Sequence, residues 1–353
     1  AFATARPDTK SDTFRILPFP EGRDITKGVH PYVAGLEKAV IRGQNAARTF
    51  YAARRDGYVP DIVMAHSGWG AGLFVKDVWP EAIFIPYLEW WYNYPPPDSQ
   101  FLGDFKGGDD VRLRQRVRNT PLLLDIQSGD VSIAPTRFQA SQFPRKFEPL
   151  IRVIHDGVDT QMHTPASDRP GEIAGLDISA MPEIVTYATR GMEPQRGFPQ
   201  FMRALERLQK RRPGLHALIV GEDRVAYGAK LPEGDSWKKR MLVECDLDLE
   251  RTHFMGHLPR PDYMRVLQAS QAHVYLTAPF VLSWSMLEAM STGCAIVGND
   301  VAPIAEFVTH ERSGLLTDFH SPDSIAAGVE RMLDDRELAA ALGANAREVI
   351  RAT

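Results

Sequence analysis

The segment 277–299 carries residue types that could bind an anion. Its sequence, TAPFVLSWSMLEAMSTGCAIVGN, predicts the end of a strand near Thr277, a helix that begins near Ser285, and another strand after Gly293. The first N–H groups of a helix have no partner inside it, so such a helix at the carboxyl edge of a parallel sheet can bind phosphate. Glu288, one turn inside, could accept hydrogen bonds from ribose hydroxyls. The spacing Ser285-x-x-Glu288 also fits a capping box, which needs no ligand.

Two arginines flank a glycine-containing turn earlier in the same half. The segment TRGMEPQRG (189–197) follows a predicted strand, and Arg190 and Arg196 stand on either side of the turn. The planar guanidinium group matches paired phosphate oxygens, so both side chains could reach one diphosphate. Two solvated arginines on a surface loop are the alternative interpretation.

A histidine and three glycines follow a predicted strand in the first half. In DIVMAHSGWGAG (61–72), His66 stands at the carboxyl end of the strand, where α/β folds place their chemistry. Gly68, Gly70 and Gly72 would let a ligand approach the backbone closely. They do not fit the G-x-G-x-x-G fingerprint, which disfavours a dinucleotide-dependent oxidoreductase. A structural histidine at a turn is the alternative for His66.

Aromatic residues gather before three consecutive prolines. The run EWWYNY (89–94) places rings beside the carboxylate of Glu89, as a sugar-binding platform requires. Core packing or a subunit contact explains the rings equally well. Asp246 and Asp248 form a carboxylate pair in a polar stretch, where a solvated face is the expected state, so we predict no metal site.

Apolar runs alternate with helical patterns along both halves. Runs that are apolar throughout suit parallel strands covered by helices on both faces. The predicted strands are 61–65, 82–86, 131–134, 151–154, 184–188, 217–220, 273–276 and 295–297. The predicted helices are 198–211, 262–269, 285–292, 322–333 and 335–350, with Ser321 as the N-cap of the fourth. This alternation predicts two doubly wound, Rossmann-like α/β domains.

A stretch rich in Pro, Gly and Ser divides the chain. Residues 163–175 lack periodicity and predict a linker. We therefore expect a first domain over 1–162, a linker over 163–180 and a second domain over 181–353. A second irregular stretch, 93–110, predicts a long surface loop.

Composition excludes several classes of protein. The 353 residues are 44% hydrophobic and 24% charged, with a net charge of −4, which is ordinary for a globular protein and gives no reason to expect nucleic-acid binding. No apolar run approaches the ~20 residues of a membrane-spanning helix. Two distant cysteines, Cys245 and Cys294, suit no zinc or disulfide framework and fit a reducing, cytoplasmic setting.

In this order, the motifs resemble the retaining glycosyltransferases of family four, which have the GT-B fold. The resemblance covers most of the chain and is strongest over 151–334. It implies that Arg190, Gly191 and Arg196 hold the diphosphate of a nucleotide-sugar donor, with Arg196 where a lysine is more usual. VIHDGVD (153–159) resembles the family's inter-domain segment.

The resemblance also assigns the nucleoside and the reacting centre. GHLPRPDYM resembles the loop whose backbone reads the base, which implies donor contacts from Gly256, His257 and Leu258. Glu288 matches the second glutamate of the E-x7-E region, which holds the ribose. His66 matches a histidine that faces the donor's reacting carbon in some members.

One departure concerns the first glutamate of E-x7-E, where this chain has Phe280. That glutamate contacts the donor sugar, so sugar recognition must differ here or activity is lost. The backbone N–H groups of Val281, Leu282 and Ser283 could still cradle the phosphates, because side-chain identity matters little for that contact.

A second departure lies at the ends. The opening AFATARPDT resembles the family's second strand, so we expect the usual first strand, its loop and the first helix to be missing. The chain stops where members usually continue into a helix that returns to the first domain. Both features suggest a fragment of a longer protein.

We therefore expect a GT-B enzyme with two domains facing a central cleft. The resemblance implies a metal-independent hexosyltransferase with no cofactor, catalytic residues His66, Arg190 and Arg196, and a donor-binding second domain. Acceptor contacts are expected from four residues of the first domain: Gly68, Trp69, Gly70 and Glu89. The expected acceptor is a glycan, a glycolipid or another hydroxyl compound, and the expected setting is the cytoplasm, including the inner face of the membrane. A GT-B epimerase and a non-catalytic nucleotide- or carbohydrate-binding protein are the alternatives.

Overall fold

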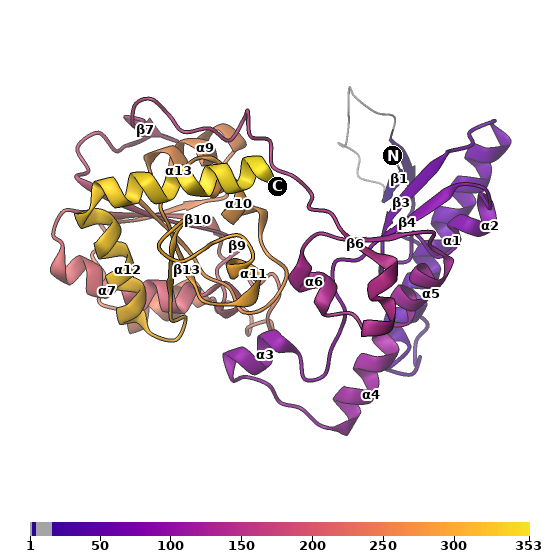
Figure 1. Cartoon of the computed structure of the whole chain (residues 1–353). Coiled ribbons are helices and arrows are strands. Elements are labelled where there is room, and N and C mark those ends of the chain that lie inside the picture. Colours follow the sequence, from indigo (N-terminus) through magenta and orange to yellow (C-terminus); the bar gives the residue numbers. More distant parts are fainter. Residues whose placement is uncertain (1, 5–15) are drawn as a thin grey trace. The chain divides into compact units, whose positions relative to one another are not determined.

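The computed structural model describes residues 2–4 and 16–353, which form two compact units (Figure 1). The first unit comprises Ala1–Gln100 and Asp104–His155, and the second comprises Phe101–Gly103 and Asp156–Thr353. The segment 163–180, expected as a linker, therefore belongs to the second unit. Its strands β7 (Glu172–Ile173) and β8 (Leu176–Asp177) form a small antiparallel pair, and Ile173 and Ile178 are fully buried.

The first unit is built on a four-stranded parallel sheet with the order β3-β4-β5-β6. Its strands are β3 (Ile62–His66), β4 (Ile83–Tyr87), β5 (Ser132–Ala134) and β6 (Ile151–Val153), each within two residues of its predicted bounds. His66 is the last residue of β3, where it pairs with Tyr87 of β4. The sheet thus brings the candidate histidine to the carboxyl edge, as the sequence indicated.

The helices of this part of the chain belong to the first unit, except that the helix at 97–102 continues into the second unit at Phe101. They are α1 (Ala34–Arg55), α2 (Val75–Val78), α3 (Pro97–Leu102), α4 (Asp109–Arg118), α5 (Thr120–Ser128), α6 (Arg137–Ser141) and the 3-10 turn η1 (Arg145–Leu150). The core between α1, α2 and β4 contains Phe50, Trp79 and Phe84, all buried. The stretch 93–110, expected as a loop, contains α3 and the beginning of α4.

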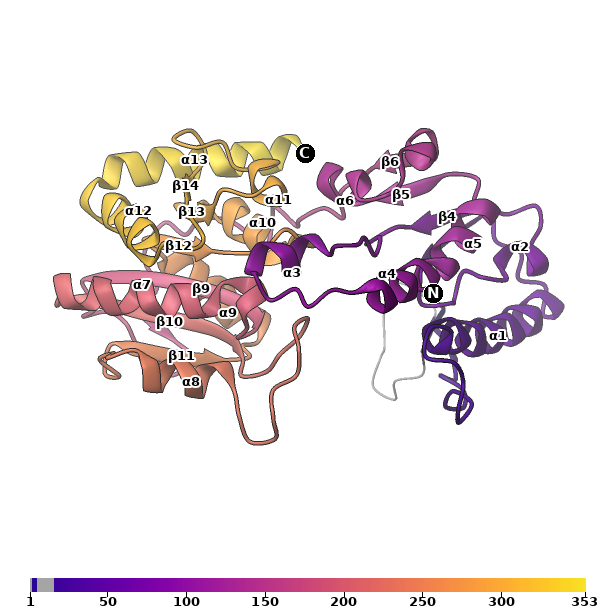
Figure 2. The ribbon, with the colours of Figure 1, turned by 90° about the horizontal axis from the view of Figure 1, so that it is seen from below.

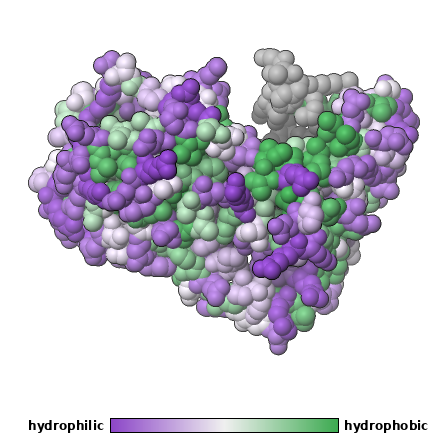
Figure 3. Space-filling view, in the orientation of Figure 1, coloured by the Kyte–Doolittle hydropathy of each residue, from purple (hydrophilic) through white to green (hydrophobic). Residues whose placement is uncertain are grey.

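Part of this unit's surface is apolar. Figure 3 shows hydrophobic side chains gathered over β3, β4 and β6. Ile62, Met64, Ile83 and Ile154 contribute, each between 47% and 58% exposed. The same strands alternate exposed with more buried residues, which is the pattern of a sheet with one face packed on helices.

The second unit has a six-stranded parallel sheet with the order β11-β10-β9-β12-β13-β14, which Figure 2 shows from bottom to top. Its strands are β9 (Glu183–Gly191), β10 (Leu215–Glu222), β11 (Thr252–Gly256), β12 (Ala272–Tyr275), β13 (Ile296–Asn299) and β14 (Leu315–Thr317). The chain proceeds outward from β9 to β11 and then returns to place β12 on the other side. Ligands of open α/β sheets bind at such a switch point, outside the carboxyl ends of the strands.

Helices cover both faces of this sheet. They are α7 (Phe198–Arg211), α8 (Trp237–Glu244), α9 (Arg260–Ala269), α10 (Trp284–Ser291), α11 (Ala302–Ala305), α12 (Pro322–Asp334) and α13 (Arg336–Ala352). Within β9, Val185 and Tyr187 pack in the core with α7 and α12, while Ile184 and Ala188 pack on the opposite face with α9. Burial on both faces explains why these strands read as continuous apolar runs.

Local capping chemistry sets the helix ends. Ser321 is the N-cap of α12, and its side chain accepts a hydrogen bond from the N–H of Ser324, as predicted. Asp335 caps α13 in the same way. The N-cap of α10 is Ser283, so this helix begins one residue earlier than the sequence indicated.

The opening of the chain is only partly covered. Strand β1 (Phe2–Thr4) pairs in parallel with β2 (Leu17–Phe19), whereas residue 1 and residues 5–15 of the opening segment lie outside the described residues. Among the described helices, none combines the length and the apolar character needed to cross a bilayer.

Candidate functional site

The second unit buries one cation at the carboxyl end of its sheet. Arg196, in the turn η2 (Pro194–Arg196), is 4% exposed and is the only buried Arg or Lys among the described residues. Its Nη1 donates to the Thr277 hydroxyl over 2.8 Å, and its guanidinium carbon lies 4.9 Å from the centre of the Tyr227 ring. Within the described part of the chain, no carboxylate lies at ion-pair distance. The buried carboxylate of Glu193 acts on Arg196 only from beyond ion-pair distance, so the guanidinium group still has room for a direct anionic partner.

A buried carboxylate fixes the loop beside this arginine. Glu193 is fully buried and accepts hydrogen bonds from the backbone N–H groups of 226–228 at 2.8–3.2 Å. The loop holds Tyr227 over Arg196 and beside Phe280, whose ring centroid is 5.4 Å away. Glu193 and Tyr227 were not predicted as site residues, because no local pattern indicates which distant backbone a buried carboxylate will cap.

Arg190 lies on a separate hollow of about 550 Å³ in the same unit. The side chain is exposed at the end of β9 and makes no hydrogen bond or ion pair with any described residue. The hollow is lined by Thr189, Arg190, Val220, Gly221, Glu222, Arg224, His257, Leu258, Pro259, Arg260 and Tyr263. Arg196 is absent from this lining, so the structure does not bring the two arginines into one pocket. A shared diphosphate site stays a prediction.

The predicted base-reading loop lines the same hollow. Gly256 ends β11 with a positive φ of 65°, and His257 is exposed beyond it. Leu258 is half-buried against the core between β7–β8 and α9. Gly191 ends β9 and is buried, with space for no side chain, because a Cβ would lie 2.7 Å from the carbonyl oxygen of Arg224.

Glu288 lies in a partly buried cluster with Arg260 and His163, and not in a capping box. It is the fifth residue of α10, whose N-cap is Ser283, so the capping-box interpretation is wrong. Its Oε1 lies 3.0 Å from Nη2 of Arg260 and 3.6 Å from Nε2 of His163. Burial, together with Arg260, lowers the pKa of His163 despite the nearby acids. Arg260 also lines the hollow with Arg190, so Glu288 is connected to that hollow through one side chain.

The segment before α10 offers fewer phosphate donors than expected. The N–H of Ser283 donates to the Tyr275 hydroxyl over 2.8 Å, so it is already occupied. Val281 is half-buried and Leu282 is buried in the core of α10. The Ser283 hydroxyl accepts a hydrogen bond from the N–H of Ser285.

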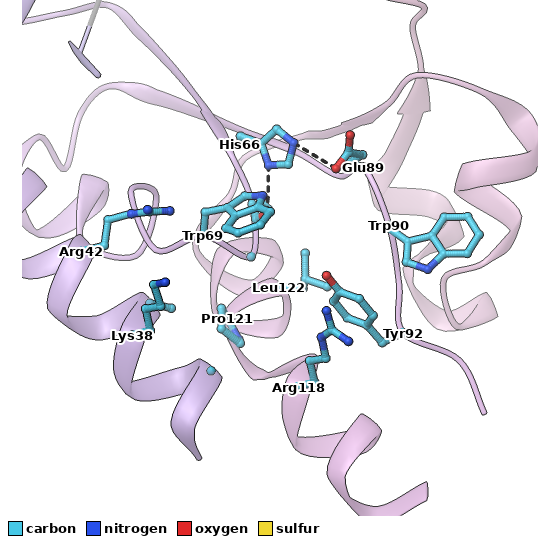
Figure 4. A pocket seen from close by; sticks show the side chains of 14 residues that line it. Lys38, Arg42, His66, Trp69, Glu89, Trp90, Tyr92, Arg118, Pro121 and Leu122 are labelled. Carbon is cyan, nitrogen blue, oxygen red and sulfur yellow. Dashed lines mark hydrogen bonds and ion pairs between the residues drawn. The ribbon is translucent and has the colours of Figure 1, made fainter. Parts of the chain in front are cut away.

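The first unit has its own pocket, of about 170 Å³, around His66 (Figure 4). His66 Nε2 lies 3.4 Å from a Glu89 oxygen, and Nδ1 lies 3.1 Å from the carbonyl oxygen of Ser67. A neutral imidazole donates from one nitrogen only, so the ring satisfies both oxygens when it is doubly protonated. This pair could exchange a proton with a hydroxyl bound in the pocket.

Four residues predicted on the acceptor side gather here: Gly68, Trp69, Gly70 and Glu89. Trp69 is 55% exposed, and its ring centroid lies 6.3 Å from that of His66. Gly70 has a φ of 100°, and a Cβ there would lie 1.9 Å from the carbonyl oxygen of Ala39 in α1. Only glycine allows α1 to pack this closely, and that packing brings the side chains of α1 to the pocket. Gly70 itself does not line the pocket, whereas the other three do.

A buried carboxylate lies behind this pocket. Asp125 of α5 is fully buried, and neither of its oxygens has a hydrogen bond of good geometry. Burial raises the pKa of Asp125 to about 6, while Ser67, the N–H of Gly68 and His66 act in the opposite direction. Asp125 was not predicted, since its burial depends on how α5 packs under the turn that follows β3.

Within residues 16–353, no three His, Cys, Asp or Glu side chains are grouped as a metal site would require. Both cysteines are buried, and burial raises the pKa of Cys245 to about 11 and that of Cys294 to about 12. Arginine, histidine and carboxylate side chains line both candidate sites.

The two halves match known protein families. Residues 1–163 match the family described as "Glycosyl transferase family 4 group", and residues 168–349 match "Glycosyl transferases group 1". The D-inositol 3-phosphate glycosyltransferase of Corynebacterium jeikeium is 24% identical over 328 residues, covering 89% of this chain and 74% of that protein. The lipopolysaccharide core biosynthesis mannosyltransferase LpsB of Rhizobium meliloti is 28% identical over 196 residues, covering 55% of this chain and 53% of that protein.

Solved structures show the same fold. HepE of Anabaena, crystallised with UDP and glucose, superposes with a TM-score of 0.68 at 18% identity, covering 96% of this chain and 81% of that one. Sucrose-phosphate synthase of Thermosynechococcus elongatus gives a TM-score of 0.69 at 16% identity, covering 99% of this chain and 83% of that one. The predicted GT-B fold is thereby confirmed, and the chain is a family-four glycosyltransferase that belongs to the glycosyl transferases group 1.

Proposed function

We propose that this glycosyltransferase moves a hexose from a nucleoside-diphosphate sugar to a hydroxyl acceptor, with retention of configuration and without a metal ion. The second unit would bind the donor and the first would bind the acceptor. HepE, a neighbour in fold, is described in complex with UDP-glucose, which makes UDP-glucose a reasonable first donor to test. The D-inositol 3-phosphate glycosyltransferases suggest a polyol as one class of acceptor.

One observation carries the donor assignment. Arg196 is buried at the switch point of the sheet and is surrounded by hydroxyl groups and aromatic rings, with no carboxylate at ion-pair distance among the described residues. A diphosphate would supply the direct anionic partner of this guanidinium group. Because the guanidinium is held in place before the ligand arrives, it can stabilise the charge that develops on the leaving group without reorganisation.

The remaining donor contacts follow from the same unit. Arg190 faces the hollow formed with His257 and Leu258, which would receive the nucleoside end of the donor. Glu288 would exchange its contact with Arg260 for ribose hydroxyls. Phe280, packed beside Tyr227, would place an aromatic surface where related enzymes have a carboxylate facing the sugar.

The test is to incubate the chain with UDP-, GDP- and ADP-hexoses and an acceptor panel, and to follow the products by NMR with and without EDTA. We expect one donor to be consumed, an anomeric configuration equal to that of the donor, and no effect of EDTA. An inverted product would overturn retention, and inhibition by EDTA that Mg²⁺ reverses would overturn metal independence.

Two alternatives give different products. A GT-B epimerase would convert the donor to a second nucleotide sugar without any acceptor. A non-catalytic protein would bind nucleotide and leave every donor intact. Phe280 favours neither alternative by itself, because removal of one carboxylate changes the sugar contacts without removing Arg196 or Arg190.

A further inference from the structure

Cationic side chains from two separate elements surround the pocket of the first unit. Lys38 and Arg42 extend from α1 on one side, and Arg118 rises from the end of α4 on another (Figure 4). Glu89 is the only carboxylate in the lining, and it lies beside His66. Three fixed positive charges therefore face one carboxylate that is already engaged. The pocket has an excess of positive charge although the chain as a whole is slightly negative.

These cations form few ion pairs within the protein. Lys38 is exposed and forms no ion pair with any described residue. Arg118 likewise has no carboxylate partner in the described part of the chain, and it lies flat on an aromatic ring, 3.6 Å from the centre of Tyr92. Arg42 contacts Glu21, which is itself 68% exposed, at 3.2 Å. Two of the three charges are thus available to a ligand.

The arrangement differs from that of a solvated helix face. Lys38 and Arg42 are four residues apart on α1, and like charges at this spacing destabilise a helix slightly. The aromatic rings restrict the two arginines, because Arg42 also lies over Trp69 at 5.9 Å. Arginines held against rings near a concave surface present their donors in fixed directions. An anion in the pocket would relieve the repulsion between the cations and use those donors.

We infer that the acceptor carries a phosphate group, which Lys38, Arg42 and Arg118 bind, while the hydroxyl that receives the sugar lies near His66 and Glu89. This inference rests on the proposed function, since it names the class of acceptor. A phosphate fits better than a carboxylate because its several oxygens can engage cations from both sides at once. Within the cavity of about 170 Å³, the phosphate would lie on the side of Lys38 and Arg118 and the hydroxyl on the side of His66 and Glu89 (Figure 4).

The test measures binding by calorimetry for matched pairs: glucose and glucose 6-phosphate, glycerol and glycerol 3-phosphate, with glucuronate as the carboxylate probe. We expect at least one phosphate ester to bind ten-fold or more tightly than its parent and than glucuronate. Lys38→Ala and Arg118→Ala should each weaken that binding about ten-fold. Arg114→Ala is the matched control, since Arg114 lies one turn before Arg118 on α4, is exposed and is outside the pocket.

The phosphate could belong to a free metabolite or to a lipid headgroup, and a second arm separates these sources. Vesicles of phosphatidylcholine with and without phosphatidic acid are sedimented with the same variants. Sedimentation that requires phosphatidic acid, Lys38 and Arg118, without binding of soluble esters, identifies a lipid phosphate. Equal binding of esters, parents and glucuronate, or no binding in either arm, would overturn the inference.

A separate measurement of nucleotide binding distinguishes a failure of the phosphate inference from a failure of the proposed donor site. The midpoint of thermal unfolding is measured with UDP, GDP and ADP for every variant. A midpoint that rises equally in the wild type, Lys38→Ala and Arg118→Ala places any loss of phosphate binding in the first unit. If no nucleotide raises the midpoint, the proposed function fails, whatever the phosphate esters do.

Discussion

The two units present positive charge in opposite ways. In the second unit Arg196 is buried, held by Thr277 and Tyr227, and has no carboxylate at ion-pair distance among the described residues. In the first unit Lys38 and Arg118 are exposed at the rim of a pocket. A buried cation fixes one ligand position and acts in low dielectric, whereas exposed cations tolerate different ligands and interact more weakly. The difference suits a constant diphosphate on one side and a variable acceptor on the other.

The largest effect should come from Arg196. Arg196→Ala removes a preorganised charge and should lower turnover by about 10²- to 10³-fold, since one such donor is worth about 2.7–4 kcal/mol. The measurement is kcat with the best donor, together with circular dichroism to confirm folding. Arg203→Ala is the control, because Arg203 forms a surface ion pair with Glu244 and should change kcat little. If Arg196→Ala folds and keeps a normal kcat, Arg196 does not stabilise the leaving group, and the proposed difference between the two units is wrong.

The first unit also contains a buried charge, the carboxylate of Asp125. The free energy that its burial costs the folded protein can be measured. Burial raises the pKa of Asp125 to about 6, above the ordinary value of 3.8. A carboxyl group with a raised pKa contributes stability below pH 3.8 and loses it as pH rises through 6. Asp125→Asn should therefore raise the free energy of unfolding at pH 7.5 by up to about 3 kcal/mol.

The expected signature is a difference between two pH values. Denaturant unfolding at pH 7.5 and pH 4 should show the Asn variant more stable at the higher pH and similar to the wild type at the lower one. Asp130→Asn is the contrasting control, because contact with Lys76 lowers the pKa of that exposed carboxyl group. If Asp125→Asn lost stability equally at both pH values, the hydrogen bonds of the carboxylate would outweigh the cost of burying it, and the prediction would be wrong.

A smaller effect should come from Glu288. Glu288→Gln should weaken binding of the cognate nucleoside diphosphate about ten-fold, which corresponds to about 1.4 kcal/mol. The 2′-deoxy nucleotide provides the control, since it lacks one of the hydroxyl groups that the carboxylate would accept from. We expect the variant to lose less affinity for the deoxy form. Equal losses for both forms would mean that Glu288 acts through Arg260 and not through the ribose.

The smallest effect should be a difference between the two units in how strongly ligand binding depends on salt concentration. Raising ionic strength from 0.05 to 0.5 M shortens the Debye length to below about 10 Å and screens exposed charges more than buried ones. Binding of a phosphate ester in the first unit should therefore weaken several-fold more than nucleotide binding in the second. Calorimetry at both salt concentrations makes the comparison. If salt weakened both affinities equally, the charges of the two sites would not differ in burial as described.

Much of the fold followed from local patterns. Continuous apolar runs predicted most of the parallel strands, and Ser321 before Pro322 marked the start of α12. Strands β11 and β14 were missed because half-buried or three-residue edge strands leave a weak periodic signal. The start of α10 was placed at Ser285, since two serines two residues apart both suit an N-cap and only the fold selects Ser283.

The site was less predictable than the fold. The position of His66 and Arg190 at the carboxyl edges of the sheets could be predicted, because a strand's direction fixes where its last residues lie. Glu193, Asp125 and Arg118 could not be, because their roles depend on contacts with residues far away in the sequence. The sequence likewise gave no sign that Arg196 is buried and that Arg190 is exposed, although they lie six residues apart.

The most direct test is the binding of nucleoside diphosphates to the wild type and to Arg196→Ala. We expect one of UDP, GDP and ADP to raise the midpoint of thermal unfolding of the wild type, because a ligand of the folded state alone stabilises it. The same nucleotide should raise the midpoint of Arg196→Ala much less. An equal rise in both proteins, or no rise with any nucleotide, would contradict the assignment of Arg196 to the donor diphosphate.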